Sequence, residues 1–198
     1  HGLGRVPDLI LAKSTTSPSS GWNTFHVSTG RNQSQSLDSS GATSSDPNAW
    51  GTSDPTDTTF GTGTLGRANN QSGMVAWCWA SVPGYSFIGS YTGNQNADGP
   101  FIYCGFKPAW VMIKSTAANN WQILDSSRNT YNTADSKLYP NSSEDEDTSA
   151  SNEMDFLSNG FKIRSASGTA NATGTTILYM AFAEAPTNNL FGGQANAR

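Results

Sequence analysis

The sequence predicts an all-β protein in which one β-sandwich plan occurs twice. Apolar residues fall in short runs or alternate, and nowhere do they keep a 3.6-residue spacing over three helical turns. Residues 4–15 and 105–116 share one pattern: Gly, two residues, Pro, a small or turn-forming residue, four apolar residues and Lys-Ser-Thr. The repeat distance of about 100 residues suits a small domain or half of a larger sandwich.

The ends of the two copies also match, because residues 74–83 align with residues 177–186. The predicted architecture is either two related modules or one sandwich built from both copies. We divide the chain into four parts in order: a first β repeat over 1–83, a connecting hairpin over 84–104, a second β repeat over 105–186, and a C-terminal tail over 187–198.

In the first copy, residues 6–13 form a continuous apolar run, which predicts a strand covered on both faces. Residues 22–27 alternate and are expected to pair with this strand across the turn at 15–21. Residues 28–59 are polar and contain two Asp-Pro pairs, so we expect loop with short strands there. Residues 74–80 then return to a strand buried on both faces.

The second copy is preceded by two strand candidates, 86–92 and 101–104, with a strong turn sequence between them. Copy two then predicts strands at 109–114, 121–124, 154–157, 160–165 and 176–183. Ser158-Asn159-Gly160 is a hairpin signal. If the strand at 101–104 leads into copy two, residues 1–3 are the end of the corresponding strand in copy one. The chain is therefore expected to begin inside a longer polypeptide.

The composition excludes some classes of partner. Charged residues make up 13% of the chain and the net charge is -4, so no basic stripe for nucleic acid or for an anionic membrane surface is expected. No apolar run approaches the roughly 20 residues that span a bilayer, so no membrane insertion is expected. The chain starts at His1 without a basic and apolar leader, so no signal peptide is expected in this numbering.

Several repeated or apolar residues are predicted to be structural. Cys78 and Cys104 lie in apolar runs and are expected to be buried free thiols, with a disulfide as the alternative. Lys13 and Lys114 end the first strand of each copy at matching positions. We expect their ammonium groups to reach solvent. Four tryptophans are expected in the core, although stacking on a sugar ring is the alternative for the first pair; they are Trp22, Trp121, Trp77 and Trp79.

Three aromatic residues are the predicted binding residues, because each lies in a polar loop outside any apolar run. They are Trp50 in copy one and Tyr131 and Tyr139 in copy two. A flat aromatic face suits the apolar side of a sugar ring. The alternative is that each residue anchors its own loop.

Residues 144–147 form the one dense acidic cluster. Such carboxylates can gather around Ca²⁺, but the glycine and terminal Glu of an EF-hand loop are missing, so a solvated acidic loop is expected. A copper site at His1 needs a second histidine, and His26 lies in a strand that looks structural. No Gly-x-Ser-x-Gly motif and no pair of carboxylates stands out. We therefore expect no catalytic residue, no metal site and no cofactor.

Six strings, taken together and in order, resemble a domain of bacteriophage virion proteins that are often labelled tail fibre proteins and are common among marine phages. The strings cover nearly the whole chain: residues 1–4, 89–94, 98–101, 105–114, 156–162 and 179–184. Residues 93–96 depart slightly from the family's pattern, which affects turn geometry.

The resemblance implies a non-catalytic virion surface component, a tail fibre or related appendage that helps to recognise the host. Such a component is extracellular on the particle, is assembled in the host cytoplasm, and contacts other virion subunits and a host glycan or outer-membrane receptor. By analogy with phage fibres, a homotrimer is expected. The alternatives are a purely structural component, such as a capsid or tail decoration or a fibre spacer, and an enzyme acting on surface polysaccharide.

Overall fold

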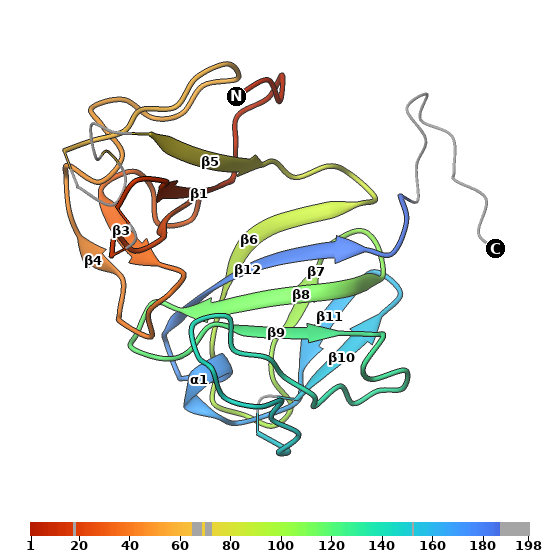
Figure 1. Ribbon diagram of the computed structural model, residues 1–198. Coiled ribbons are helices and arrows are strands. Elements are labelled where there is room, and N and C mark those ends of the chain that lie inside the picture. The colour runs from red at the N-terminus through yellow and green to blue at the C-terminus, as the bar shows by residue number, and fades with distance from the viewer. Residues whose placement is uncertain (18, 65–68, 70–72, 152, 187–198) are drawn as a thin grey trace. The chain divides into compact units, whose positions relative to one another are not determined.

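The protein folds as two compact all-β units (Figure 1). The computed structural model describes residues 1–17, 19–64, 69, 73–151 and 153–186. The first unit contains His1–Ala80 with Ala117–Asn119, and the second contains Ser81–Thr116 with the described residues from Asn120 onward. The predicted tail at 187–198 lies outside the described residues. None of the described helices is long and apolar enough to cross a membrane.

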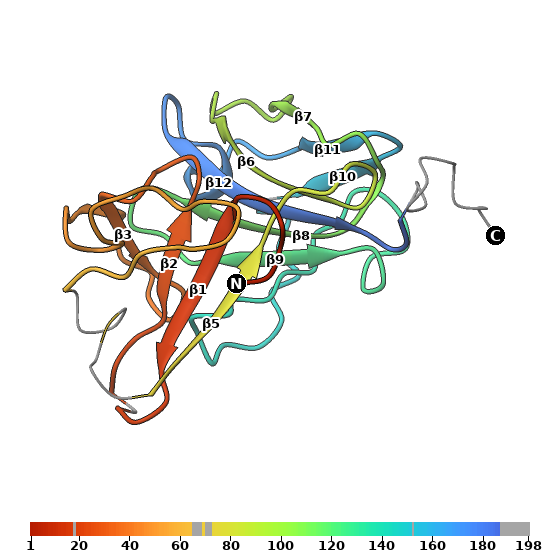
Figure 2. The same cartoon turned by 90° about the horizontal axis from the view of Figure 1, so that it is seen from above.

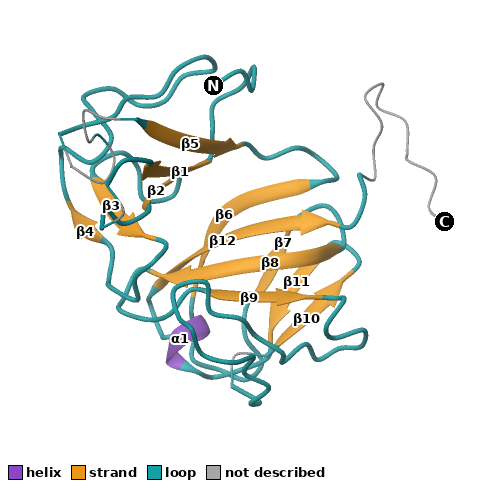
Figure 3. Cartoon of the chain, viewed as in Figure 1, coloured by secondary structure: helices purple, strands orange, loops and turns teal. Residues whose placement is uncertain are grey.

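The first unit is built on a five-stranded antiparallel sheet in the order β4-β3-β2-β1-β5. Its strands, in chain order, are β1 (Leu9–Ser14), β2 (Asn23–His26), β3 (Gln33–Ser36), β4 (Ser44–Ser45) and β5 (Met74–Trp79). The predicted pairing of the first two strands is confirmed. Residues 46–64 contain no strand and form a long loop (Figure 3).

One face of this sheet is covered by the long loop. Ile10, Ala12 and Phe25 lie in one buried cluster with Ala49 and Trp50 of the loop. The Trp50 ring meets the Phe25 ring edge-on, with 5.8 Å between ring centroids. Apolar side chains of an irregular segment therefore take the place of a second sheet over this core.

The second unit is a sandwich of two antiparallel sheets (Figure 2). The four-stranded sheet has the order β6-β12-β8-β9, with β6 (Ser86–Thr92), β12 (Thr176–Ala183), β8 (Pro108–Ser115) and β9 (Gln122–Asp125). The three-stranded sheet has the order β10-β11-β7, with β10 (Met154–Leu157), β11 (Gly160–Ile163) and β7 (Phe101–Tyr103). A short helix, α1 (Gly168–Asn171), precedes β12. Tyr179, Val111, Phe161 and Met154 share one buried core that joins the sheets.

The central strands of the two units pair in the same register. Lys13 pairs with Val75, and Lys114 pairs with Leu178. Leu9 pairs with Trp79, as Trp110 pairs with Phe182. On the other side, Ala12 pairs with Asn23 and Ile113 with Gln122. These are the pairs that the sequence alignment of the copies requires, so the shared register supports the predicted duplication.

The correspondence extends into the loops, where the two sequences differ most. Ser34 pairs with Ser44, and Lys137 pairs with Asp147. The main-chain nitrogen of Trp22 donates to Asp38 Oδ1 at 2.9 Å, and that of Trp121 donates to Asn141 Oδ1 at 2.8 Å. Ser44 and Met74 are thirty residues apart in the first copy, and Asp147 and Ile177 are thirty residues apart in the second. The second copy forms β10, β11 and α1 in this length, whereas the first forms its long loop.

Several predictions about single elements need correction. The segment 84–104 is not a hairpin, because β6 pairs with β12 in one sheet and β7 with β11 in the other. The strand β5 is not buried on both faces, because it lies at the end of its sheet and Trp77 is 43% exposed, with its ring stacked on that of Trp22. Both cysteines are free thiols, but Cys78 is only half-buried.

Candidate functional site

The long loop of the first unit, together with Asn69, lines a cavity of about 640 Å³ that is open to solvent. Most of its described lining side chains carry hydroxyl or amide groups: Asn48, Thr52, Ser53, Thr56, Thr59, Thr62, Thr64 and Asn69. Asp54 adds a carboxylate, and Phe60 adds an aromatic ring. The wall therefore offers many neutral hydrogen-bonding groups beside one apolar surface.

Glycines bring the two halves of this loop together. A Cβ on Gly63 would lie 1.6 Å from the main-chain oxygen of Asn48, and one on Gly61 would lie 3.0 Å from that of Trp50. Gly51 has a φ of +81°, which side-chain-bearing residues rarely adopt. The glycines of the sequence Gly61-Thr62-Gly63 therefore allow the two halves of the loop to approach each other at the cavity.

Side chains hold the rim of the cavity in place. Arg31 Nη1 donates to the main-chain oxygen of Gly51 at 3.0 Å, and its Nε lies 3.4 Å from Asp54 Oδ1. The hydroxyl of Thr56 accepts from the main-chain nitrogens of Thr58 and Thr59, which closes a turn at the rim. The Arg31–Asp54 pair itself contributes little stability, because the Asp54 side chain is 81% exposed. Its effect is to fix the direction of the carboxylate.

A second candidate contact is the loop of the second unit that presents Tyr131, which is 85% exposed. The position lies in an insertion, because Asp125 and Lys137 are twelve residues apart, whereas their counterparts His26 and Ser34 are eight apart. The Asn132 amide bonds to the main-chain nitrogen and oxygen of Phe156 in β10, at 2.9 and 3.0 Å. The loop is thus tied to the sheet directly beside the exposed ring.

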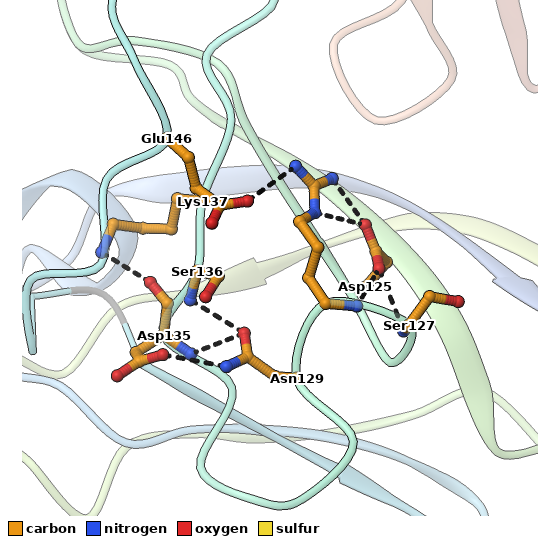
Figure 4. Close-up of polar contacts among 8 residues, drawn as sticks. Asp125, Ser127, Asn129, Asp135, Ser136, Lys137 and Glu146 are labelled. Atoms are coloured by element: carbon orange, nitrogen blue, oxygen red, sulfur yellow. Dashed lines mark hydrogen bonds and ion pairs between the residues drawn. The ribbon is translucent and has the colours of Figure 1, made fainter.

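Asn129 ties the other side of this loop (Figure 4). Its Oδ1 accepts from the main-chain nitrogens of Asp135 and Ser136, at 3.2 and 2.8 Å, and its Nδ2 donates to Asp135 Oδ1 at 3.0 Å. Tyr131 is therefore presented between two anchored residues. A ring held in this way loses little conformational entropy when it binds a partner.

Two cations hold the acidic segment at 144–147. Arg128 donates to Asp125 Oδ2 at 2.8 and 2.5 Å and to Glu146 Oε2 at 3.4 Å (Figure 4). The buried Lys137 donates to the main-chain oxygens of Asp135 and Ser149, at 3.0 and 2.7 Å, and its Nζ lies 3.7 Å from Asp147 Oδ2. The described part of the chain contains no group of three or more His, Cys, Asp or Glu side chains placed to hold a metal ion.

The surroundings of the ionisable groups in this cluster shift their pKa values. The hydroxyl of Tyr139 donates to Asp147 Oδ2 at 2.5 Å, and this bond, with those from Ser149, holds the pKa of Asp147 well below its usual value. Burial lowers the pKa of Lys137, although Asp147 and Asp135 act in the opposite direction. Burial alone would raise the pKa of Asp125, but the bonds from Arg128 outweigh it, so the pKa is lowered.

Comparison with known proteins places the chain in a family. The profile of a domain of unknown function, DUF7483, matches residues 1–186. The chain belongs to this family. Neither the search of curated proteins nor the search of solved structures found a match. The match spans the described residues of both units of the DUF7483 chain.

The three predicted binding residues of this DUF7483 domain have three different settings. Trp50 is 1% exposed and belongs to the core, so its predicted role as a contact residue is wrong. Tyr139 is half-buried and bonded to Asp147, which fits the alternative of a loop anchor. Tyr131 is open to solvent. The prediction missed the cavity residues around Phe60, whose only signal in the sequence was a Gly- and Thr-rich segment next to an aromatic residue.

The repeated lysines also differ from expectation. Lys114 has no exposed surface, and its Nζ donates to the main-chain oxygen of Ser115 at 2.7 Å. Burial lowers the pKa of Lys114 to about 8. The prediction of a solvent-reaching ammonium group is therefore wrong for Lys114, whereas Lys13 is partly exposed and donates to the main-chain oxygen of Ser20.

Proposed function

We propose that this chain is a surface domain of a bacteriophage virion, part of a tail fibre or a related appendage, and that it binds a glycan of the host surface without catalysing a reaction. The observation that carries the glycan part is the cavity of the first unit, where hydroxyl and amide side chains surround Phe60. Sugar rings present hydroxyl groups around their edge and C–H groups on their faces, so they match such a wall. The virion part rests on the resemblance of the six sequence strings.

The low charge of the chain supports a neutral or weakly charged ligand. Only 13% of the residues are charged, and Asp54 carries the one carboxylate among the described lining residues of the cavity. A strongly anionic polymer would need several cations in the wall. We therefore propose a neutral or amine-bearing sugar, whose hydroxyl or ammonium groups donate to Asp54.

The test is retention on an array of bacterial lipopolysaccharides, capsular polysaccharides and teichoic acids. Asp54→Ala, and Ser53→Ala more weakly, are expected to reduce retention, because they remove hydrogen-bonding groups from the cavity wall. Ser40→Ala is the matched control, since Ser40 is also exposed on a loop of the first unit but does not line the cavity. Retention of no glycan, or equal retention by all variants, would contradict the proposal and favour a structural role.

By analogy with phage fibres we also propose a homotrimer that assembles with other virion subunits, is made in the host cytoplasm and works on the extracellular particle. Sedimentation equilibrium of the purified chain measures the mass of the assembly and so tests the homotrimer. A mass of one chain at all concentrations would contradict the trimer.

A further inference from the structure

The outer edge of β5 lacks a strand that its counterpart in the second unit possesses. There, β12 is paired on both sides, with β8 and with β6. In the first unit, β5 pairs with β1, and no described strand lies on its other side. Because β5 and β12 have the same register against β1 and β8, the position of β6 defines where a strand would lie beside β5.

The main-chain groups of β5 are directed accordingly. The main-chain nitrogen of Thr15 donates to the oxygen of Gly73, and alternation along an antiparallel ladder then directs the N–H and C=O groups of Met74, Ala76 and Cys78 to the outer edge. No main-chain bond from these three residues to the outer side occurs in the part of the chain that the structure describes.

Their counterparts in the second unit are all paired. Ile177, Tyr179 and Ala181 lie opposite three residues of β6, which are Tyr91, Gly89 and Phe87. The main-chain bonds of Gly93 to Thr175 and of Ala183 to Tyr85 fix these as the hydrogen-bonded pairs of the ladder. The hydrogen-bonding groups that β5 leaves unused are therefore those that β12 uses to hold β6.

The core of the first unit is less completely covered than that of the second. Met74, Cys78 and Phe60 pack against its buried cluster but are themselves only partly buried. At the positions of the second unit that correspond to Met74 and Cys78, Ile177 and Ala181 have no exposed surface. In the second unit, Tyr91 of β6 is part of the buried core and the Phe87 ring stacks on that of Tyr179. A strand with aromatic residues at these places would cover Met74 and Cys78.

The residues of β5 themselves carry neither of two common features that keep edge strands apart. The six residues of β5 include no charged residue and no proline. Exposed edge strands are usually protected by such residues, by bulges or by a covering segment. An edge strand without charge or proline, with partly exposed apolar side chains beside it, suits the addition of a strand.

We propose that the outer edge of β5 is a binding site for an extended peptide segment with the aromatic–x–Gly–x–aromatic pattern that Phe87, Gly89 and Tyr91 form in β6. The segment adds antiparallel to β5, with its glycine opposite Ala76 and its two aromatic side chains on the core side. This site is independent of the glycan function proposed above.

The experiment uses the full chain and a synthetic nine-residue peptide with the sequence of residues 85–93. Two further peptides carry one N-methyl group each. Methylation of the Gly89 amide removes a donor that faces β12 in the second unit, whereas methylation of the Ile88 amide removes one on the opposite edge. Fluorescence anisotropy measures the affinity, and hydrogen exchange measures the protection of single amides in the chain.

The expected result is saturable binding, at least tenfold weaker for the peptide methylated at Gly89 than for the one methylated at Ile88. Bound peptide should slow exchange at the amides of Ala76 and Cys78 and leave the amides of β9 unchanged. Because the decisive change is in the peptide, no variant of the protein has to fold. Equal affinity for the two methylated peptides, binding without protection at Ala76, or no binding would each overturn the proposal.

Discussion

Lys114 carries an amine without exposed surface at a place where its charge is costly. Burial lowers the pKa of Lys114 to about 8, while an unfolded lysine titrates near 10.4. Between these values the unfolded state binds more protons at this group than the folded state, so Lys114 is expected to make the free energy of unfolding rise as the pH increases from about 8 to 10. The buried thiol of Cys104, whose pKa burial raises to about 12, contributes in the opposite direction above about pH 9. Urea denaturation at pH 7.5, 9 and 10 measures this slope.

Lys114→Met is the variant that isolates this effect, because it keeps the length of the side chain and removes the titrating group. Its slope between pH 8 and 10 should be smaller than that of the wild type. The remaining slope comes from Lys137, whose pKa burial also lowers, and from Cys78 and Cys104, whose pKa values burial raises. Above about pH 10 the buried tyrosines act in the opposite direction, since burial raises the pKa of Tyr91 and of Tyr179. An unchanged slope in Lys114→Met would contradict the assignment.

Trp50 and Tyr131 are expected to respond in opposite ways to truncation. Trp50→Ala should lower the free energy of unfolding by about 3–5 kcal/mol, because it empties the space under the long loop of the first unit. Tyr131→Ala should change it by less than about 0.5 kcal/mol, because the ring is 85% exposed. Equilibrium unfolding in urea measures the free energy of unfolding of both variants. A large loss for Tyr131→Ala would show that the ring packs against the protein and is not presented to a partner.

The sequence alone could not show that Trp50 is buried and Tyr131 exposed, because both lie in polar segments with turn-forming neighbours. What buries Trp50 is the approach of residues 61–63 and of β2, which are distant in the sequence. The insertion that exposes Tyr131 became visible only through the pairing of Lys137 with Asp147. The burial of Lys114 likewise depends on tertiary surroundings, since a lysine at a strand end has the same local sequence whether or not its head is covered.

At the scale of the elements, Gly160 decides whether β7 can join its sheet. A Cβ at this position would lie 2.0 Å from the main-chain oxygen of Ile102, on the strand that pairs with it. Gly160→Ala is therefore expected to cost about 1–3 kcal/mol of unfolding free energy, because the two strands must move apart. Thermal unfolding of the purified variants measures the loss.

Gly168 provides the matched control, since it starts α1 and a Cβ there would meet nothing within 4 Å. Gly168→Ala should leave stability unchanged or raise it by up to about 1 kcal/mol, because alanine restricts the unfolded chain. If Gly160→Ala and Gly168→Ala melted at the same temperature, the close approach of β7 to β11 would not matter for stability.

The elements that could be predicted are those with an apolar signal. The strands β1, β8 and β12 are continuous apolar runs, and the turn at Ser158 and Asn159 joins β10 and β11 as its sequence predicts. The strand β3 reads Gln-Ser-Gln-Ser and was expected only as part of a polar loop, because its place is set by pairing with β2 and not by hydrophobicity. The run in β5 resembles a strand covered on both faces, yet no described strand flanks its outer edge.

At the scale of the whole molecule, the two units differ in how much core each possesses. The buried cluster of the second unit contains 17 residues from both of its sheets, whereas that of the first contains five residues with three partly buried neighbours. A fragment of residues 81–186 is therefore expected to unfold cooperatively near the melting temperature of the full chain, and a fragment of residues 1–80 to unfold at a lower temperature. Circular dichroism during heating distinguishes the two outcomes. Cooperative unfolding of the fragment 1–80 near the melting temperature of the full chain would contradict this expectation.

The two sheets built around β1 and β8 can be completed at different times during synthesis, because β5 pairs with β1 and β12 pairs with β8. All strands of the first sheet are present once residue 79 is made, but the four-stranded sheet of the second unit waits for residues 176–183. The intervening hundred or so residues take roughly 5–20 s to synthesise at usual translation rates. During that time the uncharged strand β5 is already on the nascent chain, while β12 and the strands that pair with it are still being made. Strand addition at this edge can therefore begin before the chain that carries it is complete.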